Sequence, residues 1–245
     1  MLAILNYHNI AAVPMGMKMP QLYVSPEQFA RQLWWLRRVG LVGVSLSEGM
    51  RRLNKGDAAG CVALTFDDGY ADNMSSAAPI LREFGFSATC FVVSDYVGSH
   101  NAWDCEQLGG RKPLMSRADI DAWLELGFEI GSHTCSHRDL TALSREAAME
   151  ELANSHASLS RITGTPVTTF CYPYGRCNSG LARSAYQAGY QFAVTTRRGR
   201  AHASDDKMLL PRVSIDGRKG LLKFLCKAAT AYCDLGFHGR DGVHA

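Results

Sequence analysis

Short apolar runs rich in β-branched residues recur along this chain, and helical patterns lie between them. Such alternation is typical of parallel strands joined by crossover helices, so it limits the chain to α/β architectures. The number of runs fits either a closed barrel or a doubly wound sheet. The predicted strands are residues 2–7, 42–45, 61–66, 88–93, 128–131, 168–172 and 191–195.

Several predicted helices begin at a serine that can cap the first turn. Ser25 is followed by Pro26 and Gln28, which is a capping pattern with proline at the first helical position. Ser116 and Ser144 have the same place in later helices. The predicted helices are residues 25–39, 79–84, 116–127, 144–162, 179–188 and 217–234.

The 245 residues contain no linker, repeat or composition break, so we expect a single domain over residues 1–245. A net charge of +3 is too small to predict a nucleic-acid partner. The eight cysteines include no CxxC pair and do not suggest a disulfide framework. The start has no secretory signal pattern, and no apolar stretch approaches the roughly 18 residues of a membrane span. We therefore expect a cytoplasmic protein of undetermined oligomeric state.

The clearest motif, Cys61-Val-Ala-Leu-Thr-Phe-Asp-Asp-Gly-Tyr70, ends a predicted strand in two carboxylates. Adjacent side chains on a strand point in opposite directions, so Asp67 and Asp68 can serve one site only if the chain bends. Gly69 permits such a bend. A plain Asp-Gly turn explains this motif equally well when it is taken alone.

A second motif, Phe128-Glu-Ile-Gly-Ser-His-Thr-Cys-Ser-His137, places two histidines after another predicted strand. Residues four apart share one face of a helical turn, so His133 and His137 can bind one ion. Such a pair taken alone is more often a coincidence. However, the carboxyl ends of parallel strands meet at one rim, where one aspartate and two histidines form a metal triad with open positions. The other aspartate then stays free as a base.

A third motif, Thr168-Thr-Phe-Cys-Tyr-Pro-Tyr-Gly175, turns at Pro173 and Tyr174 on the same rim. A backbone N–H group in such a turn can stabilise a developing oxyanion. A simple junction between a strand and a turn is the alternative, and this motif alone would favour it.

Together, TFDDGY, SHTCSH and FCYPYG resemble the motifs of the NodB-type polysaccharide deacetylases, and the resemblance extends from Tyr7 to about Val213. The resemblance implies a distorted (β/α)7 barrel and an enzyme that removes N- or O-acetyl groups from sugars. It also implies a bound divalent metal ion, for which zinc is the first choice and cobalt and nickel are the alternatives.

The resemblance also implies a role for individual residues of this chain. Asp67 would be the general base, and Asp68, His133 and His137 would be the metal ligands. The Tyr174 backbone N–H would bind the oxyanion, in the turn that begins at Pro173.

One departure from the family pattern concerns the charge beside the catalytic aspartate. Family members often carry a tethering arginine where this chain has Cys171. A subset resembling the poly-N-acetylglucosamine deacetylases has a small residue there and the sequence FxYPYG, as this chain does. We expect Arg212 to supply the missing charge at Asp67, with a surface arginine as the alternative.

The second departure concerns the general acid, which in the family is a histidine that ends a C-terminal strand with the pattern LxIxLxH. Here the pattern occurs at the front of the chain, as Leu2-Ala-Ile-Leu-Asn-Tyr-His8, with Asn6 in place of the last leucine. The first and last strands of a closed barrel are neighbours. We therefore expect a circularly permuted barrel with His8 as general acid, and the alternative is a histidine that only follows a buried strand.

Two further segments have weaker predictions. Trp103 and Asp104, in a long loop, are predicted to stack on a sugar and to bind it by a hydrogen bond, unless Trp103 only anchors the loop. The predicted helix over residues 217–234 is amphipathic. We expect it to pack on the barrel, with contact to an anionic membrane surface as the alternative.

The sequence thus predicts a metal-dependent deacetylase of an N-acetylated sugar polymer or a lipid-linked sugar. Two other classes stay open. One is a carbohydrate-binding protein that has lost turnover, which the missing arginine at residue 171 suggests. The other is a metal-dependent amidase with a non-sugar substrate, which would need the same catalytic residues.

Overall fold

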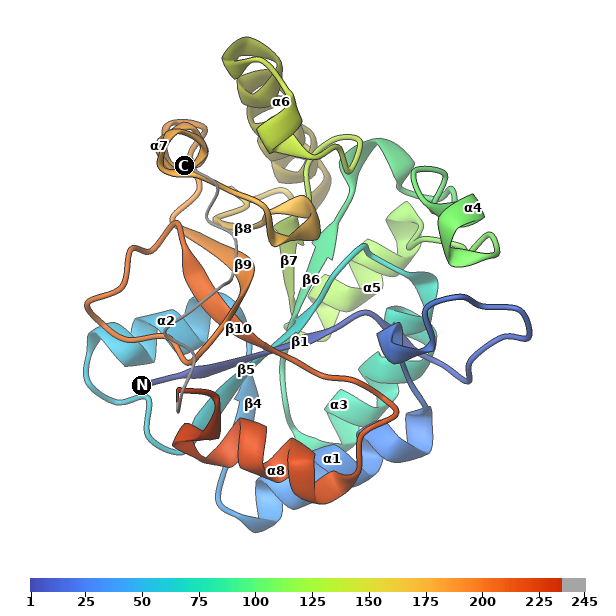
Figure 1. The fold of residues 1–245 in the computed structure, drawn as a ribbon, viewed down its shortest axis with the longest axis vertical. Coiled ribbons are helices and arrows are strands. Elements are labelled where there is room, and N and C mark those ends of the chain that lie inside the picture. Colours follow the sequence, from blue (N-terminus) through green and yellow to red (C-terminus); the bar gives the residue numbers. More distant parts are fainter. Residues whose placement is uncertain (235–245) are drawn as a thin grey trace.

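Seven parallel strands close into a barrel that helices surround on its outer side (Figure 1). The computed structural model describes residues 1–234; the prediction of one domain extends to residues 235–245, which lie outside the described residues. The strands are β1 (Ala3–Tyr7), β4 (Val42–Val44), β5 (Cys61–Phe66), β6 (Thr89–Val92), β7 (Glu129–Ser132), β8 (Thr169–Cys171), β9 (Phe192–Arg198) and β10 (Leu210–Ser214), with a separate pair, β2 (Asn9–Ile10) and β3 (Tyr23–Val24).

The helices follow most of the strands and cross to the next one. They are α1 (Pro26–Arg38), α2 (Leu46–Asn54), α3 (Ala78–Phe84), α4 (Cys105–Leu108), α5 (Arg117–Glu125), α6 (Arg145–Thr163), α7 (Ser179–Gln187) and α8 (Leu221–Ala229). The side chains of Ser25, Ser116 and Ser144 accept a hydrogen bond from the first turn of α1, α5 and α6, which confirms these predicted helix starts.

The first strand of the chain closes the barrel. The ring runs β1-β10-β9-β8-β7-β6-β5, and β1 pairs with β5 as well as with β10, parallel in both cases. The (β/α)7 prediction is therefore confirmed, and β1 occupies the place between the last and first strands that the permuted arrangement requires. β4 pairs only with the first half of β5, on the edge that β6 shares, and so lies outside the ring.

The structure contains elements that were not predicted, and one predicted helix is shorter than expected. Strand β10 was not predicted, because Pro211 lies in it and proline is rare inside sheets. Helix α2 was not predicted either. The helix expected over residues 217–234 is shorter, since α8 spans Leu221–Ala229 and packs against α1 and β1 with Phe224 and Ala228 buried. No helix within residues 1–234 is long and apolar enough to cross a membrane.

Side chains alternate between the barrel interior and the outer helices. Leu2 and Ile4 belong to an apolar cluster to which six of the seven ring strands contribute, whereas Ala3 and Leu5 belong to the cluster beneath the helices. Because the strand period is two residues, the positions that continue the interior series at the carboxyl ends are polar. They include Asn6 in β1 and His8 directly after it, Asp67 after Ala63 and Thr65 of β5, and Arg212 after Leu210 of β10.

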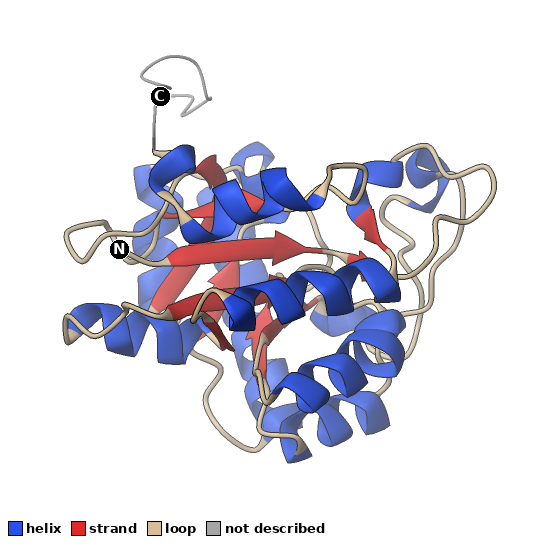
Figure 2. Cartoon of the chain, turned by 90° about the horizontal axis from the view of Figure 1, so that it is seen from below, coloured by secondary structure: helices blue, strands red, loops and turns tan. Residues whose placement is uncertain are grey.

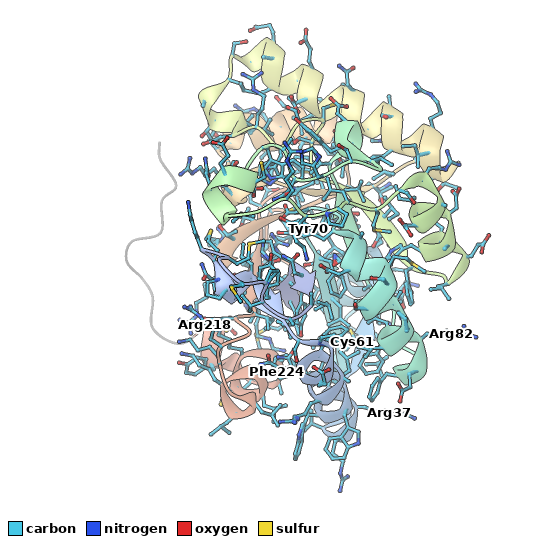
Figure 3. All side chains as sticks on the ribbon, turned by 90° about the vertical axis from the view of Figure 1, so that its right-hand side faces the viewer. Arg37, Cys61, Tyr70, Arg82, Arg218 and Phe224 are labelled. Carbon is cyan, nitrogen blue, oxygen red and sulfur yellow. The ribbon has the colours of Figure 1, made fainter. Side chains whose placement is uncertain are left out.

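The polar end of the barrel is the side toward which the strands point. In Figure 2 the long strand beginning near the N-terminus points to the right, and Figure 3 views the molecule from that side. Tyr70, which directly follows the two aspartates and Gly69, lies near the centre of this view, and Phe224 of α8 lies below it.

Candidate active site

Backbone strain is concentrated at this rim. Residues 1–234 contain four non-glycine residues with positive φ: Asp68 (74°), Thr134 (69°), His137 (61°) and Tyr174 (59°). Each left-handed residue costs about 1–2 kcal/mol, and such conformations persist where the surrounding structure holds them, often at functional sites. All four lie in the three sequence motifs, so the strained backbone marks a single region of the fold.

The two adjacent aspartates reach one cavity because the chain bends between them. The Asp67 N–H donates to the Tyr7 carbonyl (3.0 Å), which continues the pairing of β5 with β1. Asp68 and Gly69 both adopt left-handed angles, so the second carboxylate turns toward the side of the first. The bend that was predicted at the glycine therefore begins one residue earlier, and both carboxylates line the cavity.

Asp68, His133 and His137 bring three potential metal-binding atoms together. Oδ1 of Asp68 lies 3.3 Å from Nε2 of each histidine, and all three residues are buried. Burial would raise the pKa of Asp68, but hydrogen bonds from the two histidines outweigh it and hold this pKa well below its usual value. Burial lowers the pKa of His137. Burial would also lower the pKa of His133, but its contacts with Cys171 and Asp68 outweigh it and raise this pKa well above its usual value. The cluster thus combines a carboxylate with two imidazoles whose pKa values are shifted in opposite directions.

These residues fit a tetrahedral metal ion such as Zn²⁺. Bond lengths of about 2.0–2.2 Å separate the donor atoms of a tetrahedron by about 3.3–3.6 Å, and both Asp68–histidine separations of 3.3 Å agree with this range. Three protein ligands leave a fourth position for water or substrate. Asp67, His133 and Cys171 also have close donor atoms, but Arg212 donates to both Asp67 and Cys171 and occupies that space.

Contacts beyond the three ligands orient the two imidazoles. Nδ1 of His133 lies 2.7 Å from the Cys171 carbonyl, which places its proton there and leaves Nε2 free to bind a metal. The His137 ring stacks on Trp103 (4.7 Å between centroids, 20° between planes) and meets the Tyr174 ring edge to face at 4.9 Å. Both rings are therefore held before any ligand binds.

The loop that contains Trp103 and Asp104 does not place both side chains in the cavity, as a sugar-binding role for both would require. Trp103 covers His137 and is not among the side chains that line the cavity, whereas Asp104 is. Burial, together with the charge of Asp68, raises the pKa of Asp104 to about 6. Its Oδ1 accepts a hydrogen bond from the Asn101 side chain at 2.9 Å. Within this loop, then, the Asp104 carboxylate is the group that faces the cavity.

Arg212 is buried on the interior side of β10 and pairs with Asp67. Its two terminal nitrogens lie 2.7 Å from Oδ1 and 2.7 Å from Oδ2 of Asp67, and its side chain has 0% exposure. Nε donates to the Thr195 carbonyl at 2.9 Å, and one terminal nitrogen donates to Thr65 Oγ1 at 3.2 Å. Burial alone would raise the pKa of Asp67, but the Arg212 charge and hydrogen bonds outweigh it and lower this pKa.

His8 faces the same carboxylate from the end of β1. Its Nε2 lies 4.0 Å from Oδ2 of Asp67, and its side chain is 22% exposed. This separation is too long for a direct hydrogen bond, so the imidazole is not held by the carboxylate. The Asn73 side chain donates to the His8 carbonyl at 3.1 Å and fixes the backbone.

A cavity of about 600 Å³ joins these groups, which is within the usual size range of small-ligand sites. It is lined by His8, both aspartates, both histidines and Asp104, and by the exposed Tyr174. Pro173 is buried in the short turn Pro173–Gly175 that gives Tyr174 its left-handed backbone. Of the predicted site residues, Trp103, Pro173 and Arg212 lie behind the cavity wall.

Some residues that support the site have no recognisable signal in the sequence. Thr195 holds the Arg212 side chain, although it lies on a strand without any motif. Glu151, on α6, accepts hydrogen bonds from the loop between the two histidines. Thr65 could have been found, because it is two residues before Asp67 and so shares its interior side.

Known proteins share the seven-stranded barrel that carries this buried Asp–His–His cluster. The sequence profile named "Polysaccharide deacetylase" matches residues 54–193. Among relatives, YxkH of Bacillus subtilis strain 168 is 29% identical over 216 residues, which are 87% of this chain and 71% of that protein. The poly-beta-1,6-N-acetyl-D-glucosamine N-deacetylase of Staphylococcus epidermidis is 25% identical over 244 residues, with 89% of this chain and 81% of that protein covered.

Solved structures agree with these sequence matches. The deacetylase PplD of Streptococcus pyogenes, in complex with acetate, superimposes with a TM-score of 0.80 at 25% identity over 93% of this chain and 97% of that one. The chain belongs to the polysaccharide deacetylase family.

Proposed function

We propose that this protein is a metal-dependent N-deacetylase of an amino sugar in a polysaccharide or glycolipid. The observation that carries the proposal is the Asp67 carboxylate, which is held ionised by Arg212 next to a cluster suited to a metal. The N-deacetylase name of the Staphylococcus epidermidis relative supports an N-acetylated polymer as the substrate.

Asp68, His133 and His137 would hold the metal ion, for which zinc is our first choice and cobalt or nickel the alternatives. When bound there, a divalent ion would polarise the acetyl carbonyl and make water more acidic. Asp67 would accept the proton of the attacking water as general base. Because Arg212 binds both Asp67 oxygens, it would keep this carboxylate ionised and fixed in orientation.

The leaving amine needs a proton, since an amide anion is a very poor leaving group. His8 is placed for this step: it lines the cavity and lies across from Asp67 without being bound to it. The Tyr174 backbone N–H would stabilise the oxyanion that forms as water attacks. Asp104 would accept a hydrogen bond from a sugar hydroxyl at the cavity wall.

Acetate release tests this proposal directly. The purified chain should release acetate from β-1,6-linked N-acetylglucosamine oligomers, lose this activity after chelation, and regain it when Zn²⁺ or Co²⁺ is restored. Asp67→Asn should abolish release, whereas Asp57→Asn, at an exposed position before β5, should not. Metal-dependent cleavage of simple amides alone would favour the non-sugar amidase. Oligomer binding without acetate release would favour the binding protein.

Peripheral membrane contact through α8 is a separate proposal. The apolar face of α8 is largely used against α1 and β1, but Leu222 stays 77% exposed beside Lys223. An exposed leucine with neighbouring cations suits an anionic lipid surface. Co-sedimentation with anionic vesicles should fall for Leu222→Ser, and equal sedimentation of the two proteins would exclude this contact.

A further inference from the structure

The loop that carries the two histidines is bound from outside by one acidic side chain of α6. Oε2 of Glu151 accepts hydrogen bonds from the Cys135 and Ser136 backbone N–H groups, both at 3.0 Å. Oε1 of Glu151 accepts a third hydrogen bond from the Ser136 hydroxyl at 2.5 Å. One carboxylate thus binds the centre of the five-residue segment that runs from His133 to His137.

This loop needs such support because its backbone is strained. Thr134 and His137 both have left-handed angles, at a cost of about 1–2 kcal/mol each. Two successive N–H groups that follow a left-handed residue form a concave site that favours an anion. The Glu151 carboxylate fills that site, so its hydrogen bonds favour the conformation in which both imidazoles face Asp68.

The next turn of α6 fixes the other end of the same segment. Ser155, four residues after Glu151 and on the same helix face, accepts a hydrogen bond from the Ser132 hydroxyl at 3.0 Å. Ser132 is the last residue of β7 and directly precedes His133. Consecutive turns of one helix therefore hold the strand end and the loop that follows it.

We infer that Glu151 is a positioning residue that preorganises the metal-ligand loop, and this inference rests on the proposed metal-dependent function. Glu151 is not among the residues that line the cavity, and it acts through the Cys135 and Ser136 backbone and the Ser136 hydroxyl between the two histidines. Its neighbour Glu150 is exposed on the same helix, so the chain provides a matched control.

Zinc affinity is the measurement that separates positioning from general stability. Metal-free full-length protein is titrated with Zn²⁺ in competition with a chromogenic chelator. We expect Glu151→Ala to weaken Zn²⁺ binding by about ten- to a hundredfold, as is usual when groups that orient metal ligands are lost. Glu151→Gln should stay close to the wild-type affinity, because its amide oxygen can accept hydrogen bonds from both N–H groups. Its amide NH₂ group can donate to the Ser136 hydroxyl. Glu150→Ala should bind Zn²⁺ like the wild type.

Unchanged zinc affinity in a folded Glu151→Ala protein would overturn the inference. If that variant does not fold, Glu151→Asp replaces it, since the shorter side chain keeps the charge but not the reach, and unchanged affinity would overturn the inference in the same way. A wild-type chain that binds none of Zn²⁺, Co²⁺ and Ni²⁺ would overturn the proposed function itself, before any variant is compared.

Discussion

Replacement of Arg212 by methionine is the sharpest test of how the site is built. Methionine keeps most of the apolar volume but removes the guanidinium from Asp67, which is itself only 4% exposed. Breaking a buried ion pair by removing one partner costs about 3–5 kcal/mol, because the other charge stays buried without compensation. For a domain of this size each kcal/mol lowers Tm by about 2–4 °C, so we expect a Tm lower by about 6–20 °C.

The stability lost in Arg212→Met should depend on pH, and the direction of this dependence follows from the pKa of Asp67. In the wild type the pKa of Asp67 is lowered. The ion pair therefore adds stability above about pH 4, which is the pKa of an aspartate in the unfolded chain. That stability is lost as the pH falls through the folded pKa. Without Arg212, burial raises the pKa, so the variant loses further stability as the pH rises through the new value. The difference in free energy of unfolding should therefore be smaller near pH 4 than at pH 7.

Urea denaturation of the metal-free proteins measures this difference at two pH values. We choose pH 4.5, about half a unit above the unfolded carboxyl pKa, and pH 7.5, well above it. Arg218→Met is the control, because Arg218 forms an exposed pair with Asp216 and such pairs contribute about 0–1 kcal/mol. The double variant Arg212→Met/Asp67→Asn should recover part of the stability, since no buried charge remains. A loss below about 1 kcal/mol at neutral pH, or a double variant with the summed loss of both single variants, would refute the reasoning.

Three further predictions concern single side chains. His8→Ala should lower kcat by about 10²–10⁴-fold, as the loss of a general acid does, with unchanged Zn²⁺ affinity; near-normal turnover would exclude the role. Because the pKa of Asp104 is raised to about 6, its stabilising contribution is lost as the pH rises through that value. Metal-free Asp104→Asn should thus gain stability over wild type from pH 4 to 7 in denaturant titrations, and a constant difference would contradict this. The single variant Cys171→Arg should have a lower Tm than the double variant Cys171→Arg/Arg212→Met, because in the single variant two guanidinium groups compete for one space. Equal Tm values would argue against a shared space.

The sequence predicted the barrel because its strands and helices each carry a local signal. Apolar runs bounded by capped helices identified seven strand positions, and the strand at residues 2–7 was assigned correctly to the closing position. β10 has no comparable signal, since Pro211 and Arg212 interrupt its apolar pattern. The fold accepts both residues because tertiary contacts outweigh local preference.

The site was partly predictable for a related reason. Asp67, Asp68, His133 and His137 follow directly on predicted strands, so their meeting at one rim could be expected from parallel topology alone. Trp103 lies in a loop, where no periodicity fixes the direction of a side chain. Its stack on His137 depends on tertiary packing, and sequence alone could not distinguish that contact from a sugar platform.

The resemblance implies an arginine at position 171 in many family members, and the geometry of a small barrel explains how Arg212 can take its place. Cys171 on β8 and Arg212 on β10 both face the interior, two strands apart, and a terminal nitrogen of Arg212 lies 3.1 Å from the Cys171 sulfur. A guanidinium from either strand can therefore reach Asp67 on β5, but the interior has room for only one. The small side chain at position 171 leaves the space that Arg212 fills. A missing motif residue is then no sign of a lost site when an interior position on a nearby strand can supply the same charge.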